Sequence, residues 1–270
     1  MRAVSTKNRA VAQRGDAISD AAPEHSATIQ SVSRAVAVLK VLAARPLGCT
    51  AIEIAAATSL DRTTVHRLVR TLVAAGLVEG RGPNYRVGPA CLSLGAARLN
   101  TLGLREIALP YAVDLQQSIV KDRPAVVSIS ALASDEVVIV DRIWTAAVPL
   151  NIIMGIGWHF PADVTVSGRA MLSTFDDASI AVIIGAERFE RLMPRLQGIR
   201  KRNGMEWGIG EFHAGVGTLA CPLAGPAGTA VGALVVAGLG LERDLNEDSD
   251  LAQNLRRSAN TVSRLLQTSR

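Results

Sequence analysis

A predicted helix over residues 61–75 carries polar side chains that suit nucleic-acid bases and phosphates. Thr63, Arg67 and Arg70 project from one side, His66 lies on the flank, and the first turn holds Arg62 and Thr64. The opposite side is an apolar stripe of Val65, Leu68, Val69, Leu72 and Val73. Arginine can pair with guanine O6 and N7, and Thr and His can reach base edges or phosphates. The pattern predicts a helix for a DNA major groove; a merely solvated basic face is the alternative.

The elements around this helix favour a winged helix-turn-helix. A helix over 32–44 has the apolar stripe Val32, Ala35, Val36, Leu39 and Leu42. The capping-box sequence from Thr50 to Glu53 opens a short helix over 51–57, and a tight turn that contains Ser59 precedes the polar helix. Two short strands at 77–79 and 85–87 then form a basic hairpin, the wing. Its Arg81 and Arg86 are placed to contact phosphate or enter the minor groove.

The positive charge of the chain is concentrated in this region. The 270 residues carry a formal net charge of +5, and residues 31–90 hold eight Lys or Arg against three acids. Residues 91–270 are close to neutral. A small basic module joined to a larger neutral one indicates a polyanion-binding domain with a second function attached. We expect a disordered tail over 1–27, the DNA-binding domain over 28–89 and a second domain over 90–270, which begins with a linker helix at 90–102.

Several patterns argue against a membrane or secreted protein. Residues 219–241 hold no charge and are long enough to span a bilayer, but a Gly-Pro-Ala-Gly turn at 225–228 favours two buried strands in a hairpin. No apolar stretch follows the basic residues of the N-terminus, as a signal peptide would require. Cys49, Cys91 and Cys221 are far apart and too few for a disulfide framework. We therefore expect a cytoplasmic protein with no membrane partner.

The second half is predicted to be an α+β domain with a mainly antiparallel sheet. Helices are expected at 104–120, 167–175, a stretch ending near 202, and a terminal segment. Strands are expected at 126–132, 137–143, 149–160, 219–223 and 230–237. These strands and helices do not alternate regularly, which disfavours a doubly wound fold.

No catalytic constellation is apparent in this domain. His159, His213 and Cys221 can be drawn together as a zinc site, although their spacing has no metal-motif character. Cys221, which precedes a proline in an apolar strand, is more typical of an inert core cysteine. We expect no enzyme activity, no metal and no cofactor.

Short motifs occur in a fixed order along both halves of the chain. The first half holds Ser31–Ala35, Glu53–Ala55, Thr64–Leu68 and Tyr85–Gly88, and the second half holds Leu104–Ala108, Glu136–Arg142, Ser167–Leu172, Ile199-Arg200 and Gly204. Through these motifs the chain resembles the IclR family of bacterial transcriptional regulators. The family usually has Gly where this chain has Ser59 in the helix-turn-helix turn. Arg34, Thr50 and Tyr85 join the candidate DNA contacts, and a GAF-like fold is implied for the second domain.

The resemblance also implies a small-molecule cavity in the second domain. Matching motif to motif gives the lining residues Ile152, Phe160, Val166, Ser167, Gly208, Val216, Thr218, Val235 and Ala237. Relatives that bind small oxo-acids carry Asp, Cys and two Ser at the positions of Gly208, Thr218, Val235 and Ala237. Only Thr218 is polar here, so a small carboxylate would lose most of its partners and an apolar or aromatic effector is expected. The alternative is that Val235 and Ala237 are simply core.

Three functions compete on this sequence. The preferred one is a DNA-binding regulator, a homodimer or dimer of dimers on a palindromic operator, because one helix-turn-helix reads one half-site. The alternatives are a metal-binding or enzymatic domain fused to a nucleic-acid-binding anchor, and a scaffold that binds no DNA. The absence of paired acids, a triad or a metal motif argues against the enzyme. The charge on the first module argues against the scaffold.

Overall fold

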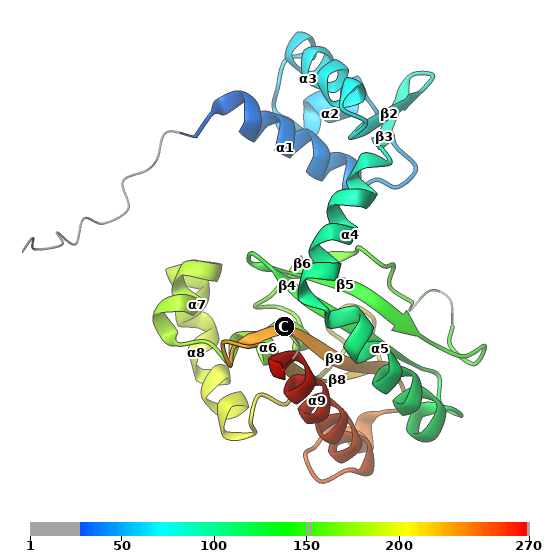
Figure 1. The fold of residues 1–270 in the computed structure, drawn as a ribbon, viewed down its shortest axis with the longest axis vertical. Coiled ribbons are helices and arrows are strands. Elements are labelled where there is room, and N and C mark those ends of the chain that lie inside the picture. Colours follow the sequence, from blue (N-terminus) through cyan, green and yellow to red (C-terminus); the bar gives the residue numbers. More distant parts are fainter. Residues whose placement is uncertain (1–27, 150, 152, 269–270) are drawn as a thin grey trace, which may run out of the picture. The chain divides into compact units, whose positions relative to one another are not determined.

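The computed structural model describes residues 28–149, 151 and 153–268, which form two compact units, Met1–Gly88 and Pro89–Arg270. The tail predicted over 1–27 lies outside the described residues. The first unit contains α1 (Gln30–Ala43), α2 (Ala51–Thr58) and α3 (Arg62–Ala74) (Figure 1). Its small sheet has the order β1-β3-β2, with β1 at Cys49–Thr50, β2 at Val78–Arg81 and β3 at Asn84–Val87. This is the predicted winged helix-turn-helix.

Local capping explains where α2 and α3 begin. The Thr50 hydroxyl accepts a hydrogen bond from Glu53 N at 3.3 Å, and Glu53 Oε2 accepts one from Thr50 N at 2.7 Å, so the predicted capping box is confirmed. Asp61 caps α3 by accepting from Thr64 N at 2.8 Å. Hydrogen bonds from the backbone N and the hydroxyl of Thr50 lower the pKa of Glu53, and those from the hydroxyl and the backbone N of Thr64 lower the pKa of Asp61. Between the helices Ser59 has a φ of 54°, a left-handed conformation that costs about 1 kcal/mol without glycine.

The apolar stripes of α1 and α3 are narrower than the sequence predicts. Val38 and Leu42 of α1 pack with Ile54, Val65 and Val69 in the core of this unit. Val32, Val36 and Val73, which were predicted to face that core, are 56%, 46% and 43% exposed. Three short helices bury only the central residues of each apolar stripe against one another. The residues at the edges of the stripes therefore stay exposed to solvent in a single chain.

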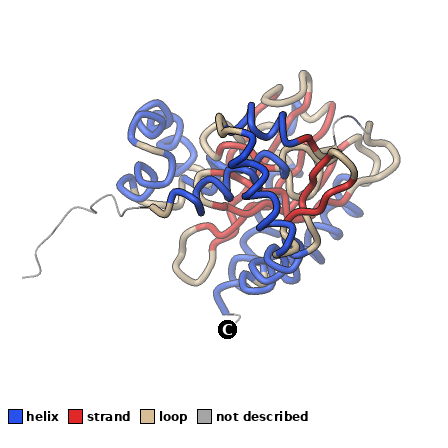
Figure 2. Tube along the Cα trace, turned by 90° about the horizontal axis from the view of Figure 1, so that it is seen from above, coloured by secondary structure: helices blue, strands red, loops and turns tan. Residues whose placement is uncertain are grey.

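The second unit is built on one antiparallel sheet in the order β6-β5-β4-β9-β8-β7. The strands are β4 (Ala125–Ala133), β5 (Glu136–Ile143), β6 (His159–Pro161), β7 (Glu206–Ile209), β8 (Val216–Ala224) and β9 (Ala230–Leu239). Figure 2 traces them in red. The helices are α4 (Ala90–Leu102), α5 (Leu104–Leu115), α6 (Val166–Leu172), α7 (Asp177–Ile184), α8 (Ala186–Lys201) and α9 (Asp250–Thr268). The α+β class with an antiparallel sheet is as predicted.

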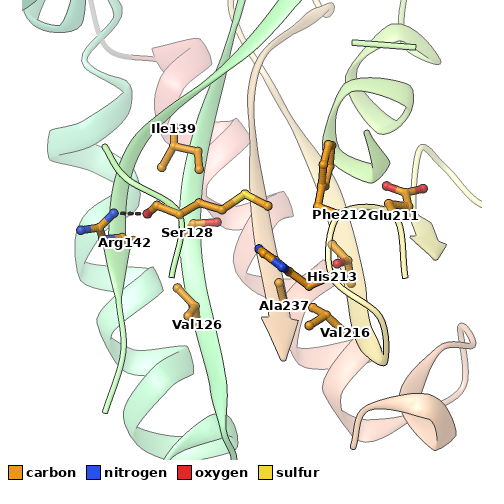
Figure 3. Close-up of a pocket in the computed structure, with 11 residues that line it drawn as sticks. Val126, Ser128, Ile139, Arg142, Glu211, Phe212, His213, Val216 and Ala237 are labelled. Carbon is orange, nitrogen blue, oxygen red and sulfur yellow. Dashed lines mark hydrogen bonds between the residues drawn. The ribbon is translucent and has the colours of Figure 1, made fainter. Parts of the chain in front are cut away.

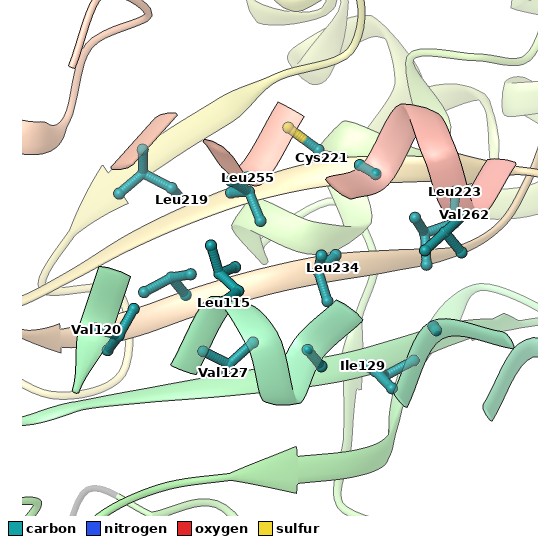
Figure 4. Close-up of a cluster of buried hydrophobic side chains, with 14 of the residues drawn as sticks. Leu115, Val120, Val127, Ile129, Leu219, Cys221, Leu223, Leu234, Leu255 and Val262 are labelled. Carbon is teal, nitrogen blue, oxygen red and sulfur yellow. The ribbon is translucent and has the colours of Figure 1, made fainter. Parts of the chain in front are cut away.

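The two faces of this sheet are covered differently. On one face, Leu115 of α5 and Leu255 and Val262 of α9 pack against Ile129 and Leu234 of the central strands (Figure 4). On the other face, α6 packs on β8 and β9 and only part of the sheet is covered. The uncharged segment 219–241 forms β8, β9 and their turn, and no described helix is long and apolar enough to cross a membrane.

Several predicted boundaries in this unit were wrong. Of the strand predicted over 149–160, only His159 and Phe160 lie in a strand, β6, and much of the rest is loop. The helix predicted over 104–120 is α-helical to Leu115 and continues as a π-helical turn, Gln116–Val120. The helix predicted at 167–175 is α6 and ends at Leu172, and β7 was not predicted. β7 has only four residues and pairs only with β8, so its sequence carries little periodicity.

Candidate functional site

The outer face of α3 presents free basic and polar side chains. Arg62, Thr63, His66, Arg67 and Arg70 are exposed, whereas Val65 and Val69 are buried at 0% and 2% exposure. No ion-pair partner is recorded for these three arginines within residues 28–149. Thr64 is different, because its hydroxyl donates to Asp61 Oδ2 at 2.6 Å and thereby belongs to the helix cap.

The other candidate DNA contacts also include both exposed side chains and side chains that are already bonded within the domain. Arg81 at the tip of the wing is exposed, but Arg86 is half-buried and forms an ion pair with Glu79 across the hairpin. Tyr85 is also half-buried, and the Thr50 hydroxyl is engaged in its capping box. Arg34 of α1 lines a groove in this unit together with Arg67 of α3. Among the candidate DNA contacts, the exposed cations for which no ion pair is seen in the described residues therefore lie on α3 and at the tip of the wing.

A two-lobed cavity opens on the less covered face of the large sheet. One lobe, of about 70 Å³, includes Val216 in its lining, and the other, of about 90 Å³, is lined in part by Phe160, Val166, Ser167 and Val235. The residues shared by both lobes are Ser128, Ile139, Met154, Glu211, Phe212, Thr218 and Ala237. Seven of the nine sequence-predicted effector residues thus surround one cavity. Gly208 lines neither lobe, and Ile152 lies outside the described residues.

Strand register brings these side chains into rows. Ala237 of β9 lies opposite both Val126 of β4 and Thr218 of β8, and Thr218 lies opposite Gly208 of β7. Since side chains alternate across a strand, this row faces the cavity, while its neighbours in the chain face α5 and α9. Ser128 occupies the next row, opposite Val235 on one side and Arg142 of β5 on the other.

A β-bulge in β5 sets the direction of Arg142. Ile129 of β4 pairs with Asp141, and the next residue, Ser130, pairs with Ile139, so Val140 is the extra residue. Ile139 and Arg142 both line the cavity. Val140 is in the core on the opposite face, and Asp141 forms an ion pair with Arg105 of α5, 2.8 Å between Nε and Oδ2. The bulge breaks the alternation and turns Arg142 toward the cavity.

Glu211 closes another part of the cavity and connects it to a buried ion network. Its carboxylate accepts a hydrogen bond from Val166 N at 2.9 Å and forms an ion pair with Arg169. A Cβ on Gly208 would stand 3.0 Å from Glu211 Oε1, so the glycine leaves room for this carboxylate. Arg169 also contacts the buried Glu206, 3.2 Å from Nε to Oε1. Glu206 in turn contacts two further arginines, Arg195 and Arg202.

Sequence reasoning missed many of the residues that line this cavity, polar ones among them. The residues found only in the structure are Val126, Ser128, Ser130, Val137, Ile139, Arg142, Met154, Thr165, Glu211, Phe212 and His213. Most belong to strands or loops in which nothing distinguishes them from core or surface residues. A polar Ser at 128 and at 130 within an otherwise apolar strand was the one available signal.

The zinc site considered from the sequence is not assembled. His213 lines the cavity, His159 contacts Glu136 with 3.0 Å between Nδ1 and Oε1, and Cys221 packs in the core on the opposite face of the sheet. Burial raises the pKa of the Cys221 thiol to about 12. Among the residues that the structure describes, no group of three or more His, Cys, Asp or Glu side chains could hold a metal ion. Cys49 and Cys221 are buried free thiols.

Comparisons with known proteins agree for both units. Residues 31–82 match the IclR helix-turn-helix domain, and residues 96–264 match the C-terminal domain of the bacterial transcriptional regulator IclR. The HTH-type transcriptional regulator TtgV of Pseudomonas putida is 30% identical over 162 residues, 59% of this chain and 60% of its own length. The chain thus matches less than two thirds of that relative.

Solved structures show the same fold. A putative IclR transcriptional regulator from Silicibacter superposes with a TM-score of 0.74 at 21% identity, covering 88% of this chain and 97% of its own. An IclR homolog from Microbacterium hydrocarbonoxydans, solved in complex with 4-hydroxybenzoate, has a TM-score of 0.69 at 21% identity and covers 88% of this chain and 100% of its own. With more than half of its length matched by the C-terminal profile alone, the chain belongs to the IclR family of bacterial transcriptional regulators, which are not enzymes.

Proposed function

We propose that this protein is a sequence-specific DNA-binding regulator whose operator affinity is controlled by a small aromatic metabolite. The observation that carries the proposal is that one chain combines an exposed, uncompensated row of arginines on a helix-turn-helix with a lined cavity in a separate unit. The arginines lie in the first unit and the cavity lies in the second, so the two features do not form one site. A regulator needs both, because a metabolite can alter DNA affinity only if it binds the competent and incompetent states unequally.

DNA recognition is assigned to α3 and the wing. Arg67 lies on the exposed face of α3, where its guanidinium group can pair with guanine edges, and Thr63 and His66 can complete the readout. Arg62 at the first turn, Arg70 farther along α3 and Arg81 at the wing tip are suited to phosphates. We assign Thr50, Thr64 and Arg86 first to the stability of the domain, since each is already bonded within it.

Self-association is part of this proposal. One helix-turn-helix covers one half-site, so a palindromic operator requires at least two chains. The uncovered apolar edge of α1, where Ile29, Val32 and Val36 are 69%, 56% and 46% exposed, supports pairing through this helix. We infer a cytoplasmic homodimer or dimer of dimers, since three cysteines that are far apart in the sequence suit a reducing compartment.

The effector is assigned to the two-lobed cavity. Its walls are largely apolar, with Ile139, Met154, Phe212, Val235 and Ala237 among them. An aromatic ring suits this lining, and the related Microbacterium protein holds 4-hydroxybenzoate. The four positions that carry the polar groups in oxo-acid-binding relatives remain unable to hold a small carboxylate, because three of them are Gly, Val and Ala.

One titration tests both halves of this function. Fluorescence anisotropy of labelled DNA from beside the protein's own gene should show binding that random DNA competes for poorly. Benzoate, 4-hydroxybenzoate or phenylacetate should shift the apparent Kd by about 5- to 150-fold. Equal affinity for random DNA would contradict sequence-specific recognition. An operator Kd that no aromatic compound changes would contradict the effector assignment.

A further inference from the structure

We propose that Arg142 is the carboxylate anchor of the effector cavity, and that the cavity selects an aromatic acid with a hydrogen-bond donor at its far end. This inference rests on the proposed function, because it names the ligand class of the same site. Its central claim is that an arginine outside the positions inferred from the family resemblance determines which molecules are recognised.

The β-bulge at Val140 determines which face of the sheet the Arg142 side chain lies on. In regular alternation from Ile139, residue 141 would face the cavity and residue 142 would face α5. The extra residue Val140 reverses this, so that Asp141 meets Arg105 on the α5 face and Arg142 lines the cavity. Bulges frequently re-aim a side chain next to a binding site, and this one places a cation there.

The Arg142 guanidinium is only partly engaged by the protein. Nη1 donates to the Met154 carbonyl, as Figure 3 shows, and the group lies 5.0 Å from the centre of the Trp144 ring. Its Nε is buried and has no hydrogen-bond partner. Within the described residues no carboxylate forms an ion pair with Arg142. A guanidinium with five donors and no counter-ion in an apolar cavity favours an anionic ligand.

The opposite end of the cavity holds Glu211, whose carboxylate accepts hydrogen bonds, and hydroxyl groups such as that of Ser130, which can accept as well as donate. Figure 3 places Glu211 across the cavity from Arg142. A ligand carboxylate there would be repelled by Glu211, whereas a hydroxyl could donate to it. Ser130, which is 2% exposed and lines the second lobe, also has a buried hydroxyl without a partner. The ligand that fits both ends carries a carboxylate at one end and a polar hydrogen at the other.

The dimensions of the cavity favour a single ring between these ends. The lobes measure about 70 and 90 Å³, whereas a benzene ring occupies an apolar cavity of about 150 Å³. A ring must therefore use both lobes, between Ile139, Met154, Phe212 and Ala237, which line each of them. A para-substituted benzoate has this length and polarity, and 4-hydroxybenzoate is the probe that matches it.

The test compares an acid with its neutral amide. Isothermal titration calorimetry on the full-length protein measures the Kd for 4-hydroxybenzoate and 4-hydroxybenzamide, which differ only at the group facing Arg142. The native protein should prefer the acid by roughly 10- to 100-fold, the effect of one charge-assisted pair. R142M should weaken acid binding by the same factor and leave amide binding unchanged, so that the preference disappears. R142K, which keeps a point charge, should retain part of it.

Arg105→Met is the matched control. Arg105 forms an ion pair with Asp141, the residue that precedes Arg142, on the opposite face of β5. It should leave the ratio of acid to amide affinity unchanged. Loss of acid and amide binding together in R142M would reduce Arg142 to packing and overturn the proposal. A native protein that binds the two probes equally, or binds neither, would also overturn it. Operator binding measured on the same samples reports on the proposed function separately, and its absence would refute that function whatever the ratio.

Discussion

At the scale of single residues, the arginines of this protein fall into two classes. Arg86, Arg169 and Arg188 each have a carboxylate partner and stabilise the fold. Arg67 on α3 and Arg142 on β5 have no such partner among the described residues, and each lies where a ligand of opposite charge would bind. Arg142 lines a cavity, where a cation without a counter-ion is costly unless a ligand supplies the opposite charge. Arg67 is exposed and carries no such cost, so its assignment rests on its place on the outer face of α3.

Arg67→Ala tests this division on α3. Arg67 is exposed and lies on the face away from the buried Val65 and Val69, so its removal should leave the melting temperature within 1 or 2 °C, about the size of a neutral surface change. Specific operator affinity should fall by about 1–3 kcal/mol. Anisotropy titrations and thermal melts of the same preparation measure the two quantities.

Lys40→Ala on α1 is the control for charge, because it removes one exposed cation from the same unit without touching α3. Its operator affinity should fall much less than that of Arg67→Ala. Equal losses in the two variants would mean that affinity follows net charge, and would remove α3 from its assigned role.

At the scale of elements, ion pairs of Arg188 connect α8 with two loops near the cavity wall. Arg188 of α8 contacts Asp135, 2.8 Å from Nη1 to Oδ2, in the turn between β4 and β5, and forms an ion pair with Asp163 just before α6. The hydrogen bond from Arg188 holds the pKa of Asp163 below its usual range, and the two carboxylates raise the pKa of Arg188. This network fixes the start of α6 and hence Val166 and Ser167.

Asp163→Asn should remove part of the acid sensitivity of folding. Because its folded pKa is lowered, Asp163 contributes stability that is fully present above its unfolded pKa of about 3.9 and is lost as the pH falls through the folded value. The variant should lose about 1–3 kcal/mol in the free energy of unfolding at pH 7. Its difference from the native protein should shrink below pH 4. Urea titrations across that range measure both.

Asp122→Asn serves as the comparison, since Asp122 is 86% exposed and its only recorded ion pair is a 3.9 Å contact with Lys121. Its unfolding free energy should stay close to that of the native protein at every pH. A difference between Asp163→Asn and the native protein that is constant down to pH 2.5 would show that Asp163 does not act through its charge.

Elements with local signals were predictable from the sequence. The box from Thr50 to Glu53 fixes the start of α2, and the boundaries of α1 to α3 were predicted to within about two residues because each has a cap or a turn. β7 and the loop before β6 were not, because pairing with β8 and β5 decides whether those segments are strands. Tertiary pairing overrides propensity in such short segments.

The cavity was predictable only where a motif marked it. Val166 and Ser167 were found through the segment Ser167–Leu172, and Val235 and Ala237 through their strand. Arg142 lies in the motif Glu136–Arg142, which is part of the family resemblance. The direction of its side chain depends on a bulge within a run of four β-branched residues, where no alternation of polar and apolar residues shows which side chains share a face. The expectation of an apolar or aromatic effector therefore took no account of Arg142, whose guanidinium group lines the cavity.

At the scale of the whole molecule, the metabolite must act on DNA through a change of state. Ala237 lines both lobes and is only partly buried, so Ala237→Phe should fill the cavity without unfolding the sheet. Operator binding should persist, while the aromatic effector loses its effect or needs at least about tenfold higher concentration. Operator titrations across effector concentrations measure this. An unchanged half-saturation would mean that the effector binds elsewhere.

The salt dependence of operator binding reports on the assembled protein. Arg62, Arg70 and Arg81 are exposed, so two subunits supply about six phosphate contacts and a log-log slope on the order of −5. If Arg86 left Glu79 for the phosphates, the slope would steepen to about −7. Anisotropy between 50 and 300 mM salt decides this, about the range over which such contacts dominate. A slope near zero would contradict DNA as the partner.

The bulge at Val140 makes the charge presented to the cavity depend on a count of residues. Deletion of Val140 would leave the pairs of Ile139, Asp141 and Arg142 in regular alternation, so Asp141 would stay on the α5 face and Arg142 would still face the cavity. Insertion of one residue between Asp141 and Arg142 would instead turn Arg142 to the α5 face. The wall of the cavity would then lose its cation although no charged side chain had been replaced, so a single-codon insertion in this strand would act as a change of ligand class.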